Sequence, residues 1–286
     1  MSRPVALRRF KSFSVNGTGV LVALVTLFPI AWMVSTAFKP SHEIFSLTPD
    51  LTPSHPTLRN FSEVISGQAS GIGSVWLFFR NSLAVTLATV LVASVISLLA
   101  SVAVARFRFR FRTSVLVMLL IVQMIPGQAL IIALFLDFKA LGLLENLLGL
   151  ILGYAALALP VSIWMLRNFV ATVPKELEEA AAIDGATAPV IFWRILFPLV
   201  APGLVATSIF SFITAYNEFI VALTFLGQAH STYTLPIYVT YFFGRGGAQW
   251  GPIMAASTLY TIPVMIFFLI VRRRLVGGLV AGAVKG

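Results

Sequence analysis

The chain contains no cysteine among its 286 residues, and only 10% of its residues are charged. The absence of thiols excludes disulfides, iron–sulfur clusters and cysteine nucleophiles. A soluble domain carries roughly 25% charged residues, so this chain has too little charge to cover a water-facing surface. Hydrophobic residues make up 58% of the chain, and its mean hydropathy is +0.95. The composition therefore predicts an integral membrane protein and excludes an ordinary cytosolic enzyme and a disordered chain.

Long apolar runs predict how the chain crosses the membrane. A span requires ~20 mostly apolar residues in a helix, because unpaired backbone groups are costly in lipid. The runs predict an all-α fold with six transmembrane helices, at about 18–38, 76–105, 114–136, 146–166, 201–226 and 252–271. Residues 1–17 would precede them as an N-terminal segment, and residues 272–286 would follow as a tail. The first run exceeds the about 7–15 apolar residues of a secretory signal, so we interpret it as a span.

Basic residues predict the orientation of these spans. If both termini are cytoplasmic, fifteen of the 20 Lys and Arg residues fall in inner segments, as the positive-inside rule favours. Residues 106–112 alternate Arg with Phe, a pattern that can bind single-stranded nucleic acid. Here the run lies in a short turn between two predicted spans, so we expect its arginines to meet lipid headgroups instead. The sequence thus predicts a multi-pass membrane protein that contacts the lipid bilayer and no nucleic acid.

One inner segment, within residues 167–198, is unusually acidic. Four of the ten acidic residues stand there within nine positions, namely Glu176, Glu178, Glu179 and Asp184. Pro174 suits a first helical turn, and Gly185 is typical of a left-handed helix end. Thr187 and Pro189 favour a second short helix, which we expect to end before Pro198. The pattern predicts a helix, a glycine turn and another helix on the inner face.

Glu176, Glu179, Ala180 and Ile183 share one face of the first predicted helix, by their spacing. An anionic inner leaflet repels carboxylates, so lipid binding is disfavoured here. Two interpretations remain open from the residues alone. The face is solvated, or it docks onto a partner that presents Arg or Lys.

A resemblance bears on this choice. The string Glu179-Ala180-Ala181-x-x-Asp184-Gly185-Ala186, followed by Ile195-x-x-Pro198, resembles the EAA loop of permease subunits of bacterial ATP-binding-cassette (ABC) importers. Residues 168–203, the tail 277–286 and Asn217-Glu218-Phe219 are similar to the second, smaller permease of maltose-type carbohydrate uptake systems. Phe197 replaces the leucine that usually precedes the proline, which exchanges one apolar side chain for another.

The resemblance implies a type I ABC importer permease in the bacterial plasma (inner) membrane that translocates a sugar, expected to be a di- or oligosaccharide. It also implies partners: a second homologous permease subunit in a heterodimer, two ATP-hydrolysing subunits and an extracytoplasmic sugar-binding protein. Coupling helices within 168–198 would dock on the ATPase, with Glu179 against a basic residue and Gly185 permitting the turn. The implied coupling residues are Glu176, Glu178, Glu179, Ala180, Ala181, Asp184, Gly185, Ala186, Ile195 and Pro198.

The sequence contains no Gly-x-x-x-x-Gly-Lys-Ser/Thr loop, so we expect no cofactor in this chain and expect ATP and Mg on the ATPase partners. No catalytic set of side chains is predicted within the spans, which argues against an intramembrane enzyme. The three histidines, His42, His55 and His230, lie in predicted outer loops without metal-ligand spacing, so no metal site is predicted.

Three polar residues are candidates for the translocation path: Gln123, Asn217 and Glu218. Glu218 is the one carboxylate predicted inside a span, where a charged group suggests function. The alternative is that these side chains form interhelical hydrogen bonds, which the residues favour slightly. An alternative for the whole chain is a self-sufficient secondary transporter or channel for a small polar solute. That class would require internal repeats or several ion-coupling groups in mid-membrane.

Overall fold

The computed structural model describes residues 5–48, 50–244 and 247–283. The chain divides into two compact units, which are described separately below. Unit 1 comprises Met1–Val75 and Val239–Thr261, and unit 2 comprises Trp76–Tyr238 and Ile262–Gly286. The predicted tail, 272–286, continues the last helix as far as Ala283, whereas residues 284–286 and residues 1–4 lie outside the described residues.

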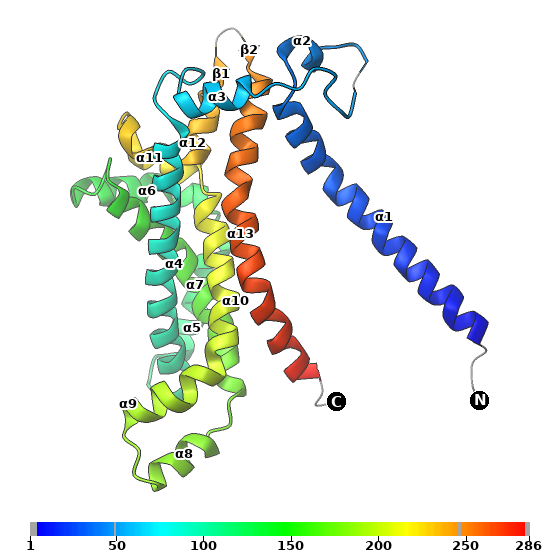
Figure 1. Ribbon diagram of the computed structural model, residues 1–286. Coiled ribbons are helices and arrows are strands. Elements are labelled where there is room, and N and C mark those ends of the chain that lie inside the picture. Colours follow the sequence, from blue (N-terminus) through cyan, green and yellow to red (C-terminus); the bar gives the residue numbers. More distant parts are fainter. Residues whose placement is uncertain (1–4, 49, 245–246, 284–286) are drawn as a thin grey trace. The chain divides into compact units, whose positions relative to one another are not determined.

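Five helical stretches among the described residues are long and apolar enough to cross a membrane (Figure 1). They are Asn16–Ala37 in α1 (Val5–Ala37), Val75–Arg106 (α4), Leu147–Thr172 (α7), Ala188–Tyr216, and Trp250–Val271 in α13 (Trp250–Ala283). The chain is therefore a multi-pass, all-α membrane protein.

The predicted third span, 114–136, is not one straight helix. It consists of α5 (Arg112–Met124) and α6 (Gly127–Ala140), which are bent by 105° relative to each other. Pro126 explains the break, because a residue before proline is pushed out of the helical region, and Ile125 is indeed extended. Counted as one broken span, this pair brings the candidate spans in the described residues to six.

The region of the predicted fifth span, 201–226, also differs from expectation. The long helix here runs from Ala188 through α9 (Ala188–Ile191), a π-helical turn η1 (Phe192–Leu196) and α10 (Phe197–Tyr216). The expectation that the second inner helix ends before Pro198 is therefore wrong. Pro198 stands at the start of α10, directly after a π turn where the hydrogen-bond ladder already changes register, so its missing N–H is tolerated. A separate short helix, α11 (Ile220–Leu226), follows.

The remaining elements of unit 2 are α8 (Glu176–Ile183), the 3₁₀ turn η2 (His230–Thr232), most of α12 (Leu235–Thr240) and the part of α13 from Ile262 on. Helices α4, α7 and α10 form the frame of this unit. Their ends meet in an apolar cluster of Leu98, Leu166, Val170, Val173, Leu196 and Val200. Serine pairs add polar contacts between helices: Ser94 and Ser208 lie 3.0 Å apart at their hydroxyls, and Ser162 and Ser211 lie 3.2 Å apart.

Gly203 allows α10 to approach α7 closely. A Cβ at Gly203 would lie 2.3 Å from Cγ and 2.7 Å from Cβ of Phe169, so Gly203→Ala must displace the ring or the helices. Overpacking of this kind costs about 1–3 kcal/mol, which we expect to lower the melting temperature of the purified chain by several degrees. Gly17→Ala is the control, because nothing lies within 4 Å of a Cβ there. Equal melting temperatures for the two variants would contradict the close approach.

Unit 1 consists of α1, α2 (Ser41–Ile44), α3 (Arg59–Ser66), the start of α13 and two short antiparallel strands, β1 (Phe243–Gly244) and β2 (Gly247–Ala248). The Asn60 side chain holds the end of α1, since its amide donates hydrogen bonds of 2.9 Å to the carbonyls of Ala37 and Lys39. These bonds join α3 to the connection that follows α1.

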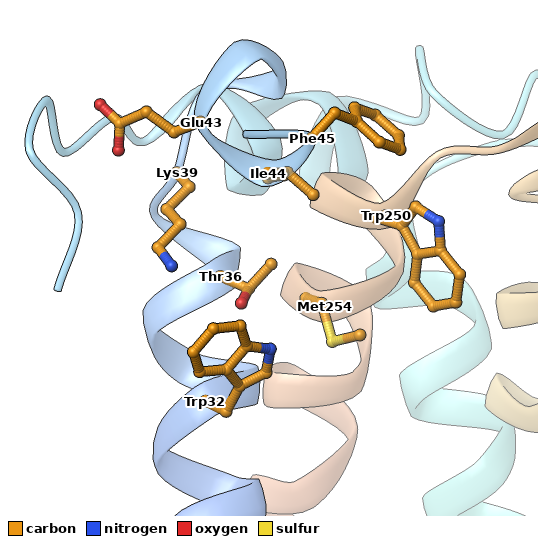
Figure 2. A pocket seen from close by; sticks show the side chains of 8 residues that line it. All are labelled: Trp32, Thr36, Lys39, Glu43, Ile44, Phe45, Trp250 and Met254. Carbon is orange, nitrogen blue, oxygen red and sulfur yellow. The ribbon is translucent and has the colours of Figure 1, made fainter. Parts of the chain in front are cut away.

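A cavity of about 280 Å³ lies in unit 1 (Figure 2). The Lys39 side chain is 3% exposed, lies 4.6 Å from the centre of the Trp32 ring and donates a hydrogen bond to the Asp50 carbonyl. Glu43 instead accepts hydrogen bonds from the backbone N–H groups of Ser54 and His55. Both charged side chains thus hold the loop between α2 and α3. The lining residues are Trp32, Thr36, Lys39, Glu43, Ile44, Phe45, Trp250 and Met254.

Candidate functional site at the α8–α9 elbow

Residues 174–191, which we call the elbow, lie beyond the ends of α4, α7 and α10 in unit 2 (Figure 1). Helix α7 ends because Val173, which precedes Pro174, is extended with φ −75° and ψ 121°. Helix α8 begins two residues after Pro174, and Glu176, Glu178 and Glu179 lie in its first turn. Carboxylates there interact favourably with the positive end of the helix dipole.

Gly185 ends α8 in the conformation that the sequence predicts. Its φ is +86°, and its N–H donates to the Ala182 carbonyl at 3.1 Å. The N–H of Ala186 donates to the Ala181 carbonyl at 2.9 Å, which completes a Schellman motif. No atom lies within 4 Å of the position that a Cβ would occupy at Gly185. The backbone conformation alone, rather than lack of space, therefore favours glycine.

The predicted outer face of α8 is exposed to its surroundings. Glu176, Glu179 and Ala180 are exposed, and Ile183 retains 86% of its accessible surface. Among the described residues, no hydrogen bond or ion pair engages the side chain of Glu176 or Glu179. Helix α8 contains no buried residue. The elbow thus presents carboxylates and an isoleucine together, and no residue in the described part of the chain covers them.

Glu178 differs from its neighbours, because it faces this chain's own α4. Its Oε1 lies 2.7 Å from Nε of Arg106, and the two side chains are 22% and 9% exposed. Arg106 also donates a hydrogen bond of 2.9 Å from Nη2 to the carbonyl of Val173. The expectation that Arg106 meets lipid headgroups is therefore wrong, whereas Arg108 and Arg110 are exposed.

The second half of the elbow is continuous with a span. Thr187 is extended before α9, and Pro189 lies in the first turn of α9, as the sequence predicts. Asp184 caps the end of α8 and is exposed, and Ile195 is half-buried in η1. Leu196, which the sequence did not single out, is 2% exposed and joins the apolar cluster with α4 and α7. The described chain is thus helical without interruption from Ala188 to Tyr216, through the π turn η1.

The three polar candidates for the translocation path lie in different settings. Gln123 is exposed in the last turn of α5. Asn217 caps α10, and its amide donates to the Ile213 carbonyl at 2.9 Å. Glu218 lies in the break between α10 and α11 rather than inside a helix, and its carboxylate accepts from the N–H groups of Val221 and Ala222 at 2.9 and 3.1 Å. Through these bonds Glu218 caps the N-terminus of α11, which is a structural role.

The described part of the chain holds no group of three or more His, Asp or Glu side chains placed to bind a metal ion. The site therefore consists of an exposed acidic elbow attached to a helical frame. Carboxylates on such a helix can accept charge-assisted hydrogen bonds from Arg or Lys.

Comparisons with known proteins agree with this description. The family model "binding-protein-dependent transport system inner membrane component" matches residues 93–279. The chain is 42% identical to the diacetylchitobiose uptake system permease protein DasC of Streptomyces coelicolor, over 95% of this chain and 96% of that protein. It is 35% identical to the trehalose/maltose transport system permease protein MalG of Thermococcus litoralis, over 93% and 94% of the two chains.

A solved structure shares the fold. One chain of a bacterial ABC transporter involved in the import of the acidic polysaccharide alginate superposes with a TM-score of 0.77 at 21% identity, over 96% of this chain and 99% of that one. The resemblance inferred from the EAA-like string is thereby confirmed at the level of family and fold. This chain belongs to the family of inner membrane components of binding-protein-dependent transport systems, and it is an ABC importer permease.

Proposed function

We propose that this chain is the second permease subunit of an importer for a di- or oligosaccharide, with transport powered by ATP hydrolysis on a partner docked at the elbow. The sugar class is supported by relatives whose names specify diacetylchitobiose and trehalose or maltose. The assignment to the permease subunits is supported by the length of the sequence match, because the 42% identity to DasC extends over 95% of this chain and is not confined to one motif.

The observation that carries the proposal is the construction of the elbow. Helix α8 has no buried residue, and Glu176 and Glu179 have no partner among the described residues, so its outer face is free to meet a complementary basic surface. The same segment connects to α7 at one end and runs through η1 into α10 at the other. A force applied to the elbow therefore reaches two spans directly.

The proposal includes the partners, nucleotide and orientation. A second homologous permease would pair with this one, two ATP-hydrolysing subunits would hold ATP and Mg, and a sugar-binding protein would deliver the substrate from outside. The arginine-rich turn 106–112 starts at the end of α4 that contacts the elbow, so the positive-inside rule assigns the elbow to the cytoplasm, where ATP is available. Both termini would then be cytoplasmic.

Reconstitution tests this proposal. The chain, its partner permease and the ATPase are placed in proteoliposomes, and uptake of labelled diacetylchitobiose, trehalose and maltose is measured with binding protein on the opposite side from ATP. We expect uptake of one of these sugars only when ATP, the ATPase and the binding protein are all present. Uptake by this chain without the ATPase, driven by an ion gradient, would support the secondary transporter instead.

A further inference from the structure

We infer that Arg106 is a positioning residue that fixes coupling helix α8 to the inner end of α4, so that movement of α8 is passed to α4 as well as to α10. This inference rests on the proposed function of the elbow as the site of ATPase docking. It assigns to Arg106 and Glu178 a role within this chain, distinct from contact with the ATPase.

The contacts of Arg106 join three elements at one point. Arg106 is the last residue of α4, where a positive charge interacts favourably with the helix dipole. Its Nε meets Glu178 in the first turn of α8 at 2.7 Å, and its Nη2 meets the carbonyl of Val173, directly after α7, at 2.9 Å. The two contacts lie on either side of Pro174. The planar guanidinium therefore holds both arms of the turn that separates α7 from α8.

The surroundings make the loss of either partner more costly than at an ordinary surface ion pair. Arg106 and Glu178 lie on the wall of a cavity of about 510 Å³ whose other lining residues are all apolar, including Leu99, Val102 and Phe192. With side chains only 9% and 22% exposed, the two charges are largely removed from water. An ion left without its partner in such a place is strongly disfavoured, so the pair resists separation.

The pair matters because α8 is short and, among the described residues, packs mostly against the elements that follow it in the sequence. The helix has eight residues and none of them is buried, and a helix of this length is marginal without tertiary contacts. Its most extensive contacts with other elements are made to α9 and η1, which follow it directly in the sequence. Arg106 thus supplies a direct polar link from α8 to a different span, α4. Leu98 of α4 and Val200 of α10 belong to the same apolar cluster, which joins α4 to the other helices of the frame.

A distance measurement tests the link itself, independently of any partner. Since the chain has no cysteine, spin labels at Arg110→Cys and Ile183→Cys, both exposed, report the separation of the α4–α5 turn and α8 in this chain purified without its partners. We expect one narrow distance distribution in the parent and a broad one in Arg106→Gln. Arg108→Gln is the matched control, because it removes the same charge from an exposed position of the same turn. An unchanged distribution in Arg106→Gln would overturn the inference.

Coupling is measured next in complexes assembled to parent levels. We expect Arg106→Gln to lower sugar transported per ATP hydrolysed about fivefold or more, with smaller loss in Arg106→Lys, which keeps the charge but not the planar fork. Arg106→Glu should be worst, and adding Glu178→Arg should recover part of the loss. A parent-like transport ratio in Arg106→Gln, or no recovery by the charge exchange, would contradict the inference.

These outcomes are separable from failure of the proposed function. Cross-linking of α8 to the ATPase tests docking, and Arg106→Gln is expected to retain that cross-link. If docking is absent in the parent, the proposed function fails. If docking is present but the distance and the transport ratio do not change, only the role of Arg106 fails.

Discussion

Glu179→Lys is expected to reduce sugar uptake at least about tenfold in a complex whose other subunits are unchanged. The Glu179 carboxylate is exposed on α8 and has no partner among the described residues, so no contact of this chain is broken by the change. A lysine there would face the basic side chain that we propose on the ATPase, and two like charges repel. Loss of one close ion pair at an interface costs about 2 kcal/mol or more, and charge reversal adds to that cost.

The measurement is initial uptake of the labelled sugar, together with the amount of ATPase that copurifies. Asp137→Lys is the matched control, because it changes the net charge equally at an exposed acidic residue of α6, away from the elbow. We expect Asp137→Lys to copurify and to transport as the parent does. Uptake by Glu179→Lys at the level of this control would contradict a role for Glu179 in docking.

Gly185→Leu is expected to reduce uptake about fivefold or more, because it disfavours the turn between α8 and α9. A residue with a Cβ pays roughly 1–2 kcal/mol in the left-handed region that Gly185 occupies at φ +86°. No steric clash contributes, because the space around the residue is open. Asparagine tolerates this conformation, so Gly185→Asn should retain most of the uptake.

A substitution at a second glycine shows whether backbone strain lowers uptake only at the elbow or wherever it occurs in the chain. Gly142 has φ +68° and also lies in open space, but it follows α6. Gly142→Leu carries a similar backbone penalty away from the coupling site, and we expect much smaller loss of uptake. Equal losses in Gly142→Leu and Gly185→Leu would show that the position of the turn is unimportant.

The local features of the elbow were predictable from the sequence because they depend on neighbouring residues. Gly185, Thr187 and Pro189 act on the backbone within a few positions, and the structure has the predicted conformations at each. The exposed face of α8 was likewise predictable, since helical spacing decides which side chains point the same way. Composition and the long apolar runs sufficed to predict an all-α membrane fold.

Features that depend on tertiary contacts were not predictable in the same way. Helical spacing places Glu178 off the face that Glu176 and Glu179 share, but only the meeting of α4 with α8 reveals Arg106 as its partner. Gly203 is similarly inconspicuous until Phe169 packs against it.

Two breaks were hidden by hydropathy, which averages over a window and does not detect a change of direction. The bend of 105° between α5 and α6 occurs within one apolar run. The end of α10 at Tyr216 lies within another, and the placement of Glu218 inside a helix followed from that run. Pro126 was the available signal for the first bend, because the residue before a proline disfavours helix. For the second, Asn217 and Glu218 are polar residues typical of helix ends.

Chemical cross-linking at α8 tests the docking of an ATPase on the elbow most directly. The chain has no cysteine, so Ala180→Cys introduces a single thiol on the exposed face of α8, and Ser54→Cys provides an exposed control on the loop before α3. A short thiol-to-amine cross-linker is applied to the transporting complex in membranes. We expect Ala180→Cys to capture the ATP-hydrolysing subunit and Ser54→Cys to leave it uncaptured. Absence of any captured ATPase at Ala180→Cys, in membranes that still import sugar, would contradict the account.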